Sequence, residues 1–169
     1  RATDYLLDLG HHRVALVNGL EFMDFAIRRR RGYVEALEAR SLKPDPMLMS
    51  SDEMSEVAGF RAAERMLRLA DAPTAFLAAS MISGMGVRRA IEGAGLVLGR
   101  DVSLIVFDDD LSYMKNGEGE PIFTAMRSSQ WSGVTSRQSW RWSWAALLTR
   151  MSAGPSSPFN RSNAEWSSP

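Results

Sequence analysis

Short apolar runs alternate with amphipathic stretches along most of the chain, up to about Ser129. The short apolar runs are typical of strands buried on both faces, whereas an apolar residue at every third or fourth position is typical of a helix that covers a sheet. The pattern predicts strands at 14–19, 46–50, 74–79 and 103–107, of which the second is weak. It predicts helices at 24–40, 55–69 and 83–94, preceded by the end of a helix at 3–9 that stops at Gly10.

The order of these elements favours an α/β fold with a doubly wound parallel sheet. In such a sheet the crossovers are right-handed, and ligands bind beyond the carboxyl ends of the strands. The segment 108–121 is polar and rich in turn residues, so we predict a loop there.

Composition and charge narrow the range of possible functions. The chain has 169 residues, 45% of them hydrophobic, which suits one globular domain with a sizeable core. Its 20 basic residues balance 20 acidic ones, so it lacks the basic excess with which a domain holds DNA on its own. The absence of cysteine excludes disulfides and cysteine chemistry and fits a cytoplasmic protein. No apolar run reaches the roughly eighteen residues of a membrane span, so we expect no membrane contact.

Four consecutive arginines, Arg28–Arg31, lie in the predicted helix 24–40. A run of this kind is usually a solvated basic face. At about 100° per residue, however, Arg29 shares the apolar stripe of Phe25 and Tyr33, whereas the other three arginines point elsewhere. A guanidinium on the inward face needs acceptors. We therefore expect Arg29 at the rim of the sheet and the other three as surface charges.

Two predicted strands deliver polar side chains to the same rim. The strand 103–107 runs into Asp108, and the strand 74–79 runs into Ser80 and Met81. One guanidinium, one carboxylate and one hydroxyl in a cleft suit a neutral polyhydroxylated or heterocyclic ligand. The alternative is an ion pair between Arg29 and Asp108 that only closes the edge of the sheet.

Catalytic and metal sites have less support. His11 and His12 are adjacent, so their side chains diverge. The three carboxylates Asp108–Asp110 cannot all face one cation, and a solvated loop is the better interpretation. No Ser/His/Asp set, no histidine pair at metal spacing and no glycine-rich phosphate loop is visible. We therefore expect no enzymatic activity, no metal and no cofactor, with a doubly wound enzyme as the alternative from another class.

Five blocks of the sequence resemble the effector-sensing domain of LacI-family transcriptional regulators. They match the family patterns LGHRRIA.I.G, R..GF..AL, PTAI.A.ND, DVSV.GFDD and P.LTTV.Q, in the family's order and spacing. The blocks are LDLGHHRVALVNG at 7–19, RRRRGYVEAL at 28–37, PTAFLAAS at 73–80, DVSLIVFDD at 101–109 and PIFTAMR at 121–127.

The resemblance implies a periplasmic-binding-protein-like fold of type I, with two lobes around an effector cleft. This chain would supply mainly the second subdomain, residues 1–121, and a crossover toward the first subdomain at 122–129. In the family, the residues that correspond to Arg29 and Asp108 contact the effector. Ser80 and Met81 replace the family's Asn-Asp pair, which predicts a less polar pocket. The expected ligand-binding residues are Arg29, Asp108, Phe25, Ser80, Met81 and Met54.

The resemblance also sets the expected partners. They are a small effector such as a sugar, a second copy of the chain, and operator DNA that is reached only through a helix-turn-helix head outside this sequence. Because the chain opens within a helix and without an initiator Met, we expect its natural N-terminus to be missing. The alternative function is a solute receptor of a transporter with the same fold. The helices 55–69 and 83–94 carry many apolar residues, including Met66, Met85, Val87 and Ile91. Some of these are core residues, and for the dimer we expect a partly apolar patch on these helices.

The tail, 130–169, differs from the rest of the chain. It holds all five tryptophans and many serines, without a clean period. Tryptophan has the single codon TGG, which is frequent when a GC-rich gene is read out of frame. At one shifted frame, codons for 130–146 can encode an amphipathic helix, and those for 158–168 can encode a strand that resembles the family's last. Our hypothesis is a frameshift near Gln130, in the gene or in the recorded sequence, and the alternative is a genuinely divergent C-terminus.

Overall fold

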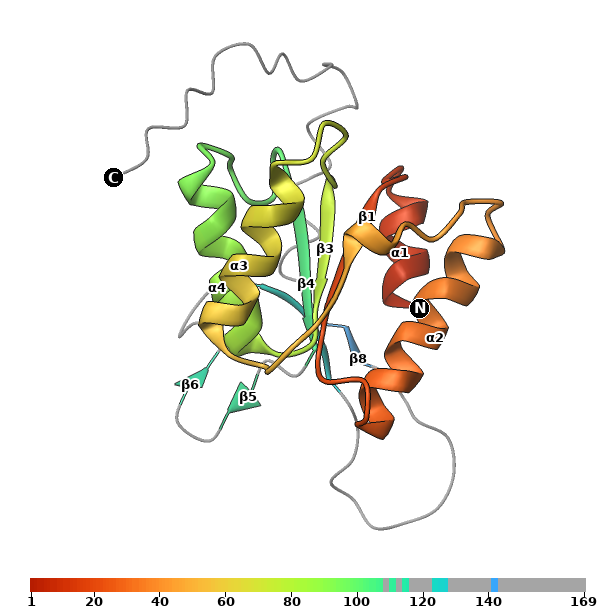
Figure 1. The fold of residues 1–169 in the computed structure, drawn as a ribbon, viewed down its shortest axis with the longest axis horizontal. Helices are drawn as coiled ribbons and strands as arrows, with labels where there is room; N and C mark the ends of the chain where they lie inside the picture. Colours follow the sequence, from red (N-terminus) through yellow and green to blue (C-terminus); the bar gives the residue numbers. More distant parts are fainter. Residues whose placement is uncertain (108–109, 112–113, 116–122, 128–140, 143–169) are drawn as a thin grey trace.

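The computed structural model describes residues 1–107, 110–111, 114–115, 123–127 and 141–142 (Figure 1). The helices of these residues are α1 (Ala2–Asp8), α2 (Asp24–Glu38), α3 (Glu56–Leu67) and α4 (Met81–Gly93), with a short 3₁₀ helix η1 (Pro46–Leu48). The strands are β1 (Val14–Asn18), β2 (Met49–Ser51), β3 (Ala75–Ala78), β4 (Ser103–Phe107), β5 (Asp110–Leu111), β6 (Met114–Lys115), β7 (Thr124–Arg127) and β8 (Arg141–Trp142).

Six of these strands form one sheet in the order β2–β1–β3–β4–β7–β8. Neighbours from β2 to β7 run parallel, and β8 pairs with β7 in the antiparallel sense. Helices α1 and α2 lie on one side of the sheet, and α3 and α4 lie on the other (Figure 1). The predicted doubly wound α/β sheet is confirmed.

Alternate residues of the central strands fill two separate cores. In β1, Ala15 and Val17 pack in the core that contains side chains of α3 and α4, whereas Val14 and Leu16 pack in the core that contains side chains of α1 and α2. Because both faces are covered, every residue of β1 and β3 is buried. This is why these strands read as continuous apolar runs rather than as alternating ones.

Two element boundaries differ from the prediction. Residues 46–48 form η1 rather than a strand, because Asp45 accepts a hydrogen bond from the Met47 N–H at 2.9 Å and caps the turn. Helix α4 begins at Met81 rather than at Ser83, because Ser80 caps it. The spacing of apolar residues in the sequence does not reveal a serine that caps a helix soon after a strand ends.

Two connections also differ from the prediction. Within the expected loop 108–121, β5 and β6 pair in a short antiparallel ladder, and strands of two residues leave no readable alternation. Residues 124–127, which we expected in the crossover, add to the sheet as β7, with Ile105 aligned with Thr124. Of the tail, the structure describes only β8, so the frameshift hypothesis and the subdomain boundaries stay predictions.

Helices α3 and α4 approach each other backbone to backbone. A Cβ added at Gly86 would lie 2.0 Å from the carbonyl oxygen of Glu56, and one added at Gly59 would lie 2.2 Å from that of Ser83. Both obstacles are backbone atoms, which cannot swing aside as a side chain can. Only glycine fits at these two positions, so the two helices form a tightly packed unit on their face of the sheet.

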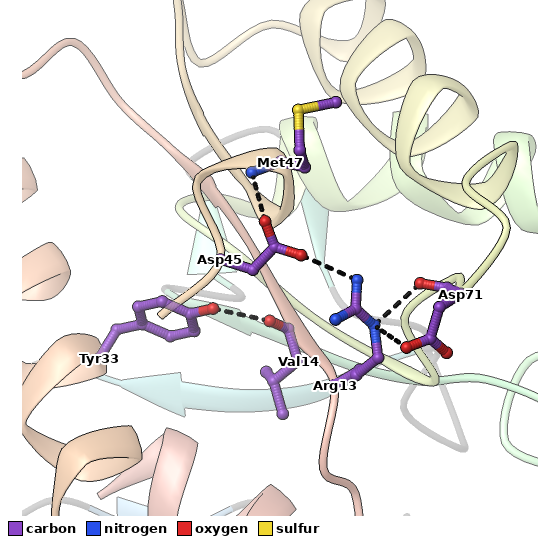
Figure 2. A network of polar contacts seen from close by, with 6 residues as sticks. All are labelled: Arg13, Val14, Tyr33, Asp45, Met47 and Asp71. Carbon is purple, nitrogen blue, oxygen red and sulfur yellow. Dashed lines mark hydrogen bonds and ion pairs between the residues drawn. The ribbon is translucent and has the colours of Figure 1, made fainter. Parts of the chain in front are cut away.

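A polar network fixes the edge at which the strands begin (Figure 2). Arg13 donates from Nη2 to Asp45 Oδ2 at 2.9 Å and from Nε to the backbone oxygen of Asp71 at 2.8 Å. The buried Tyr33 of α2 donates its hydroxyl to the carbonyl oxygen of Val14 at 2.8 Å. Burial, and then the Asp45 carboxylate, raise the pKa of Tyr33 to about 12, so the hydroxyl keeps the proton that it donates. The network joins the start of β1 to α2, to η1 and to the loop before β3.

We expect Gly86→Ala to destabilise the fold. The added methyl group meets the Glu56 carbonyl oxygen, so α3 and α4 must separate, and overpacking of this kind costs about 1–3 kcal/mol. The matched control is Gly93→Ala in the same helix, where a Cβ meets nothing within 4 Å and alanine gains up to about 1 kcal/mol in helix propensity. Urea denaturation compares the free energies of unfolding. Equal effects of the two substitutions would contradict the close backbone contact.

The Arg13–Asp45 pair predicts a dependence of stability on pH. The Met47 N–H, and then the Arg13 guanidinium, lower the pKa of Asp45 from its ordinary value. A carboxyl group whose pKa is lower in the folded chain stabilises the fold above its unfolded pKa, and this contribution is lost as the pH falls through the folded pKa. We therefore expect Asp45→Asn to lower the free energy of unfolding at about pH 7 by up to about 1 kcal/mol, and by much less at about pH 2.

The control is Asp71→Asn, which removes a carboxylate that lies 3.1 Å from Arg13 Nε but keeps the backbone hydrogen bond to Arg13. Because the Asp71 side chain is 77% exposed, its ion pair is screened, and the substitution should have little effect at either pH. Urea denaturation across this pH range measures both variants. A loss in Asp45→Asn that is equally large at both pH values would show that the charge of Asp45 contributes nothing.

Candidate functional site

The parallel strands bring several loop residues to one edge of the sheet. β1 ends at Asn18 and is followed by Gly19, β3 is followed by Ala79 and Ser80, and β4 ends at Phe107. Helices α2 and α4 begin at the same edge, because each follows one of these strands. This is the edge at which the sequence predicts a ligand site.

Arg29 reaches this edge from the second turn of α2. Its Nη1 donates a hydrogen bond to the carbonyl oxygen of Ala79 at 2.9 Å. Its guanidinium carbon lies 4.3 Å from the centre of the Phe107 ring and 4.9 Å from the centre of the Phe25 ring. Both distances are within the range of cation–π attraction. Groups from α2, from β4 and from the end of β3 thus fix the position of the guanidinium.

The other three arginines of the run lie on the exposed face of α2. Each pairs with a carboxylate on its own helix or on the loop before it. The pairs, with N–O distances of 2.9, 2.7 and 2.7 Å, are Arg28–Asp24, Arg30–Glu21 and Arg31–Glu35. The predicted separation of Arg29 from its three neighbours is confirmed.

Phe25 and Met54 lie together above the end of β1. A Cβ added at Gly19 would lie 3.0 Å from Phe25 Cε2 and 3.4 Å from Met54 Cγ. Glycine at this position therefore leaves room for both side chains. Phe25 is half-buried, and Met54, on the loop between β2 and α3, is exposed. Both predicted site residues thus lie against Gly19, and Phe25 also lies against Arg29.

Ser80 and Met81 both take part in the start of α4. Ser80 Oγ accepts a hydrogen bond from the Ser83 N–H at 3.2 Å and so caps the helix. Met81, in the first turn, is 1% exposed and packs in the core beneath α3 and α4. Its side chain offers no surface to a ligand, and we leave it out of the proposed site. The earlier start of α4 is the reason, because it turns Met81 inward.

Sequence reasoning did not identify three groups at this edge. Phe107 was interpreted only as the last residue of a buried strand, although it directly precedes Asp108. The carbonyl oxygen of Ala79 carries no signal in the sequence. Asn18 is buried, and its Nδ2 donates to the carbonyl oxygen of Ala26 at 2.8 Å. An asparagine that ends an apolar run was the signal that could have marked it. Asp108 itself lies outside the described residues, so its meeting with Arg29 stays a prediction.

The two histidines diverge, as predicted. The ring of His11 is buried, with Nδ1 2.8 Å from Thr74 Oγ1 and Nε2 2.9 Å from Ser103 Oγ, so it joins the starts of three strands. His12 is exposed. Among the residues that the structure describes, no three His, Cys, Asp or Glu side chains are placed to hold a metal ion. No helix within the described ranges has the length and apolar character needed to span a membrane.

The edge offers a ligand two kinds of contact. The planar guanidinium of Arg29 is a donor for hydroxyl, carbonyl or carboxylate oxygens. The ring of Phe25 and the thioether of Met54 offer apolar surface to the flat faces of a ring. This combination of apolar walls and a few directed polar groups is typical of small-molecule sites.

Residues 3–129 match the family described as periplasmic binding protein-like domain. The HTH-type transcriptional regulator AglR of Rhizobium meliloti (strain 1021) is 41% identical over 128 residues, which are 76% of this chain and 36% of AglR. A solved regulatory protein of the LacI family from Chloroflexus aggregans is 26% identical, with a TM-score of 0.67 over 75% of this chain and 44% of its own. The chain belongs to the LacI family.

Two further LacI-type structures share the fold. The transcriptional regulator CelR in complex with cellobiose is 28% identical, with a TM-score of 0.65 over 74% of this chain and 37% of CelR. The lac repressor dimer bound to operator and the anti-inducer ONPF is 27% identical, with a TM-score of 0.64 over 76% of this chain and 37% of its own. The LacI-family chain described here spans about a third of the length of its curated relatives. The relatives are named as transcriptional regulators or repressors, not as enzymes.

Substitution of Gly19 tests the contact between Gly19 and Phe25. The Cβ of Gly19→Ala would lie 3.0 Å from the Phe25 ring, so the ring must move, at a cost of about 1 kcal/mol in the free energy of unfolding. In a Phe25→Ala background the ring is gone, and the same substitution should cost much less. Urea denaturation of the wild type, both single variants and the double variant measures the coupling. Additive effects would show that the two residues do not touch.

Proposed function

We propose that this chain is the effector-binding part of a LacI-type, DNA-binding transcriptional regulator that acts in the cytoplasm. Its effector, a sugar or a related small molecule, binds at the sheet edge that carries Arg29, in a cleft that a second lobe completes. The position of Arg29 carries this proposal. It lies on the inward stripe of α2, over Phe25 and Phe107, where parallel strands end.

Each candidate residue has a separate role in the proposed site. Arg29 donates hydrogen bonds to ligand oxygens, and Asp108 accepts them from ligand hydroxyls. Phe25 and Met54 form an apolar wall, and Ser80 lies at the N-terminus of α4 beside it. Since the Ser80 hydroxyl already caps α4, the pocket has fewer groups free for polar recognition than one built with an Asn-Asp pair.

Two comparisons support this choice of effector and of function. A sugar effector is supported by CelR, which was solved with cellobiose. A regulator is favoured over a transporter receptor because the relatives are named as transcriptional regulators. Effector binding would favour one closure of the two lobes and thereby change the affinity of a helix-turn-helix head for operator DNA.

The proposed assembly is a dimer, as in the lac repressor structure bound to operator. The structure shows which of the four apolar residues expected on α3 and α4 are core residues. Met66, Val87 and Ile91 are fully buried in the core, and Met85 alone of the four is exposed. A dimer surface on these helices would be built around Met85 and the exposed Val57 instead.

Arg29→Ala tests the proposed function directly. The loss of hydrogen bonds from a charged group should weaken effector binding by about 1.5–3 kcal/mol, or roughly ten- to hundredfold. The fold should remain stable because the group lies at a rim. Thermal-shift and NMR titrations with a panel of mono- and disaccharides measure the binding.

Arg28→Ala and Arg31→Ala are the matched controls, because these neighbours lie on the exposed face of the same helix. Both should bind the effector as the wild type does. If all three variants behave alike, or if Arg29→Ala binds with unchanged affinity, Arg29 is not the effector contact.

A further inference from the structure

Asn18 links the sheet to the helix that carries the proposed site. It is the last residue of β1 and is 3% exposed. Its Nδ2 donates a hydrogen bond of 2.8 Å to the carbonyl oxygen of Ala26, in the first turn of α2. Its own backbone is held in the sheet, since its carbonyl oxygen accepts from the Asp52 N–H. A well-fixed strand end is thus bonded to the turn that separates Phe25 from Arg29.

The start of α2 has no side-chain cap. Helices α3 and α4 are capped by Ser55 and Ser80, whereas Met23, at the corresponding position of α2, makes no capping hydrogen bond through its side chain. The position of the first turn of α2 therefore depends on its contacts with the sheet. Ala26 lies one residue after Phe25 and three before Arg29, so a directional bond at Ala26 places both side chains.

Stability alone does not account for an amide at this position. The Oδ1 of Asn18 is buried and has no hydrogen-bond partner in the part of the chain that the structure describes. A buried acceptor without a partner costs more than one neutral hydrogen bond returns. Leucine has nearly the same shape and would pack here without this cost. Unlike leucine, the amide makes one directional hydrogen bond to α2, from Nδ2 to the carbonyl oxygen of Ala26.

We propose that Asn18 is a positioning residue of the effector site. Its hydrogen bond to Ala26 holds α2 at the height at which the Arg29 guanidinium lies over the Phe107 ring. This inference rests on the proposed function, because the value of a fixed Arg29 depends on a ligand that binds there. Asn18 acts through Arg29 and does not touch the ligand.

The test compares Asn18→Leu with Val17→Ala in the full chain. Val17 is the neighbouring buried residue of β1, but its side chain packs in the core of α3 and α4, on the other face of the sheet. The readout is the NMR signal of the Arg29 Nε–H group, identified by its loss in Arg29→Lys. In the wild type, the rings of Phe25 and Phe107 should shift this signal away from those of the exposed arginines.

In Asn18→Leu the Arg29 signal should move toward those of the exposed arginines, while the melting temperature stays unchanged or rises. In Val17→Ala the melting temperature should fall, while the Arg29 signal stays in place. Asn18→Ala gives the same test of the signal if leucine does not fit. An Arg29 signal that stays in place in both Asn18 variants, or that moves equally in Val17→Ala, would overturn the proposal.

This test is independent of the proposed function, because it needs no ligand. If the Arg29 signal responds to Asn18 as expected but no sugar of the panel binds, the proposed effector fails and the positioning role stands. If a sugar binds through Arg29 but the Arg29 signal is unchanged in the Asn18 variants, the positioning role fails and the proposed function stands.

Discussion

A parallel sheet that is covered on both faces leaves only its two edges of strand ends for function, and this constraint governs the whole chain. Helices cover both faces (Figure 1), and every residue of β1 and β3 is buried. Polar groups therefore gather before the strands begin or after they end. The starting edge holds structural contacts, such as Arg13 with Asp45 and His11 with two hydroxyl groups. The terminal edge holds Arg29 and its neighbours, and this is the edge at which we propose that a ligand binds.

The two helices that carry Arg29 and Ser80, α2 and α4, are each held by specific contacts. On one face, α2 is tied to β1 at both ends of the strand, through Tyr33 to Val14 and through Asn18 to Ala26. On the other face, the glycine contacts of α3 and α4 lock the helix that Ser80 starts. A binding group is placed accurately only when the residues around it are themselves fixed. Contacts far from the site therefore help to determine where its side chains lie.

The sequence predicted what depends on periodicity and missed what depends on single contacts. The helical period of α2 separated Arg29 from three other arginines, because the apolar stripe around it is long and regular. Met81 was misjudged because one hydrogen bond, from Ser83 to the Ser80 hydroxyl, decides where α4 begins. Phe107 was missed because a strand-end aromatic looks the same whether it faces a core or a cation. No property of the sequence shows that the backbone oxygen of Ala79 is an acceptor.

Arg29 differs from its three arginine neighbours in how firmly its side chain is positioned, not in its charge. Exposed ion pairs such as Arg28–Asp24 contribute little to stability and hold their side chains weakly. Arg29 contacts two ring faces and a backbone oxygen, which all belong to buried or half-buried residues. Rings contact the faces of a planar guanidinium, and its edge makes hydrogen bonds, whereas a lysine ammonium has no such plane. A side chain that is ordered before the ligand arrives loses less conformational entropy on binding. For this reason one arginine among four can act as the recognition group, although all four have the same chemistry.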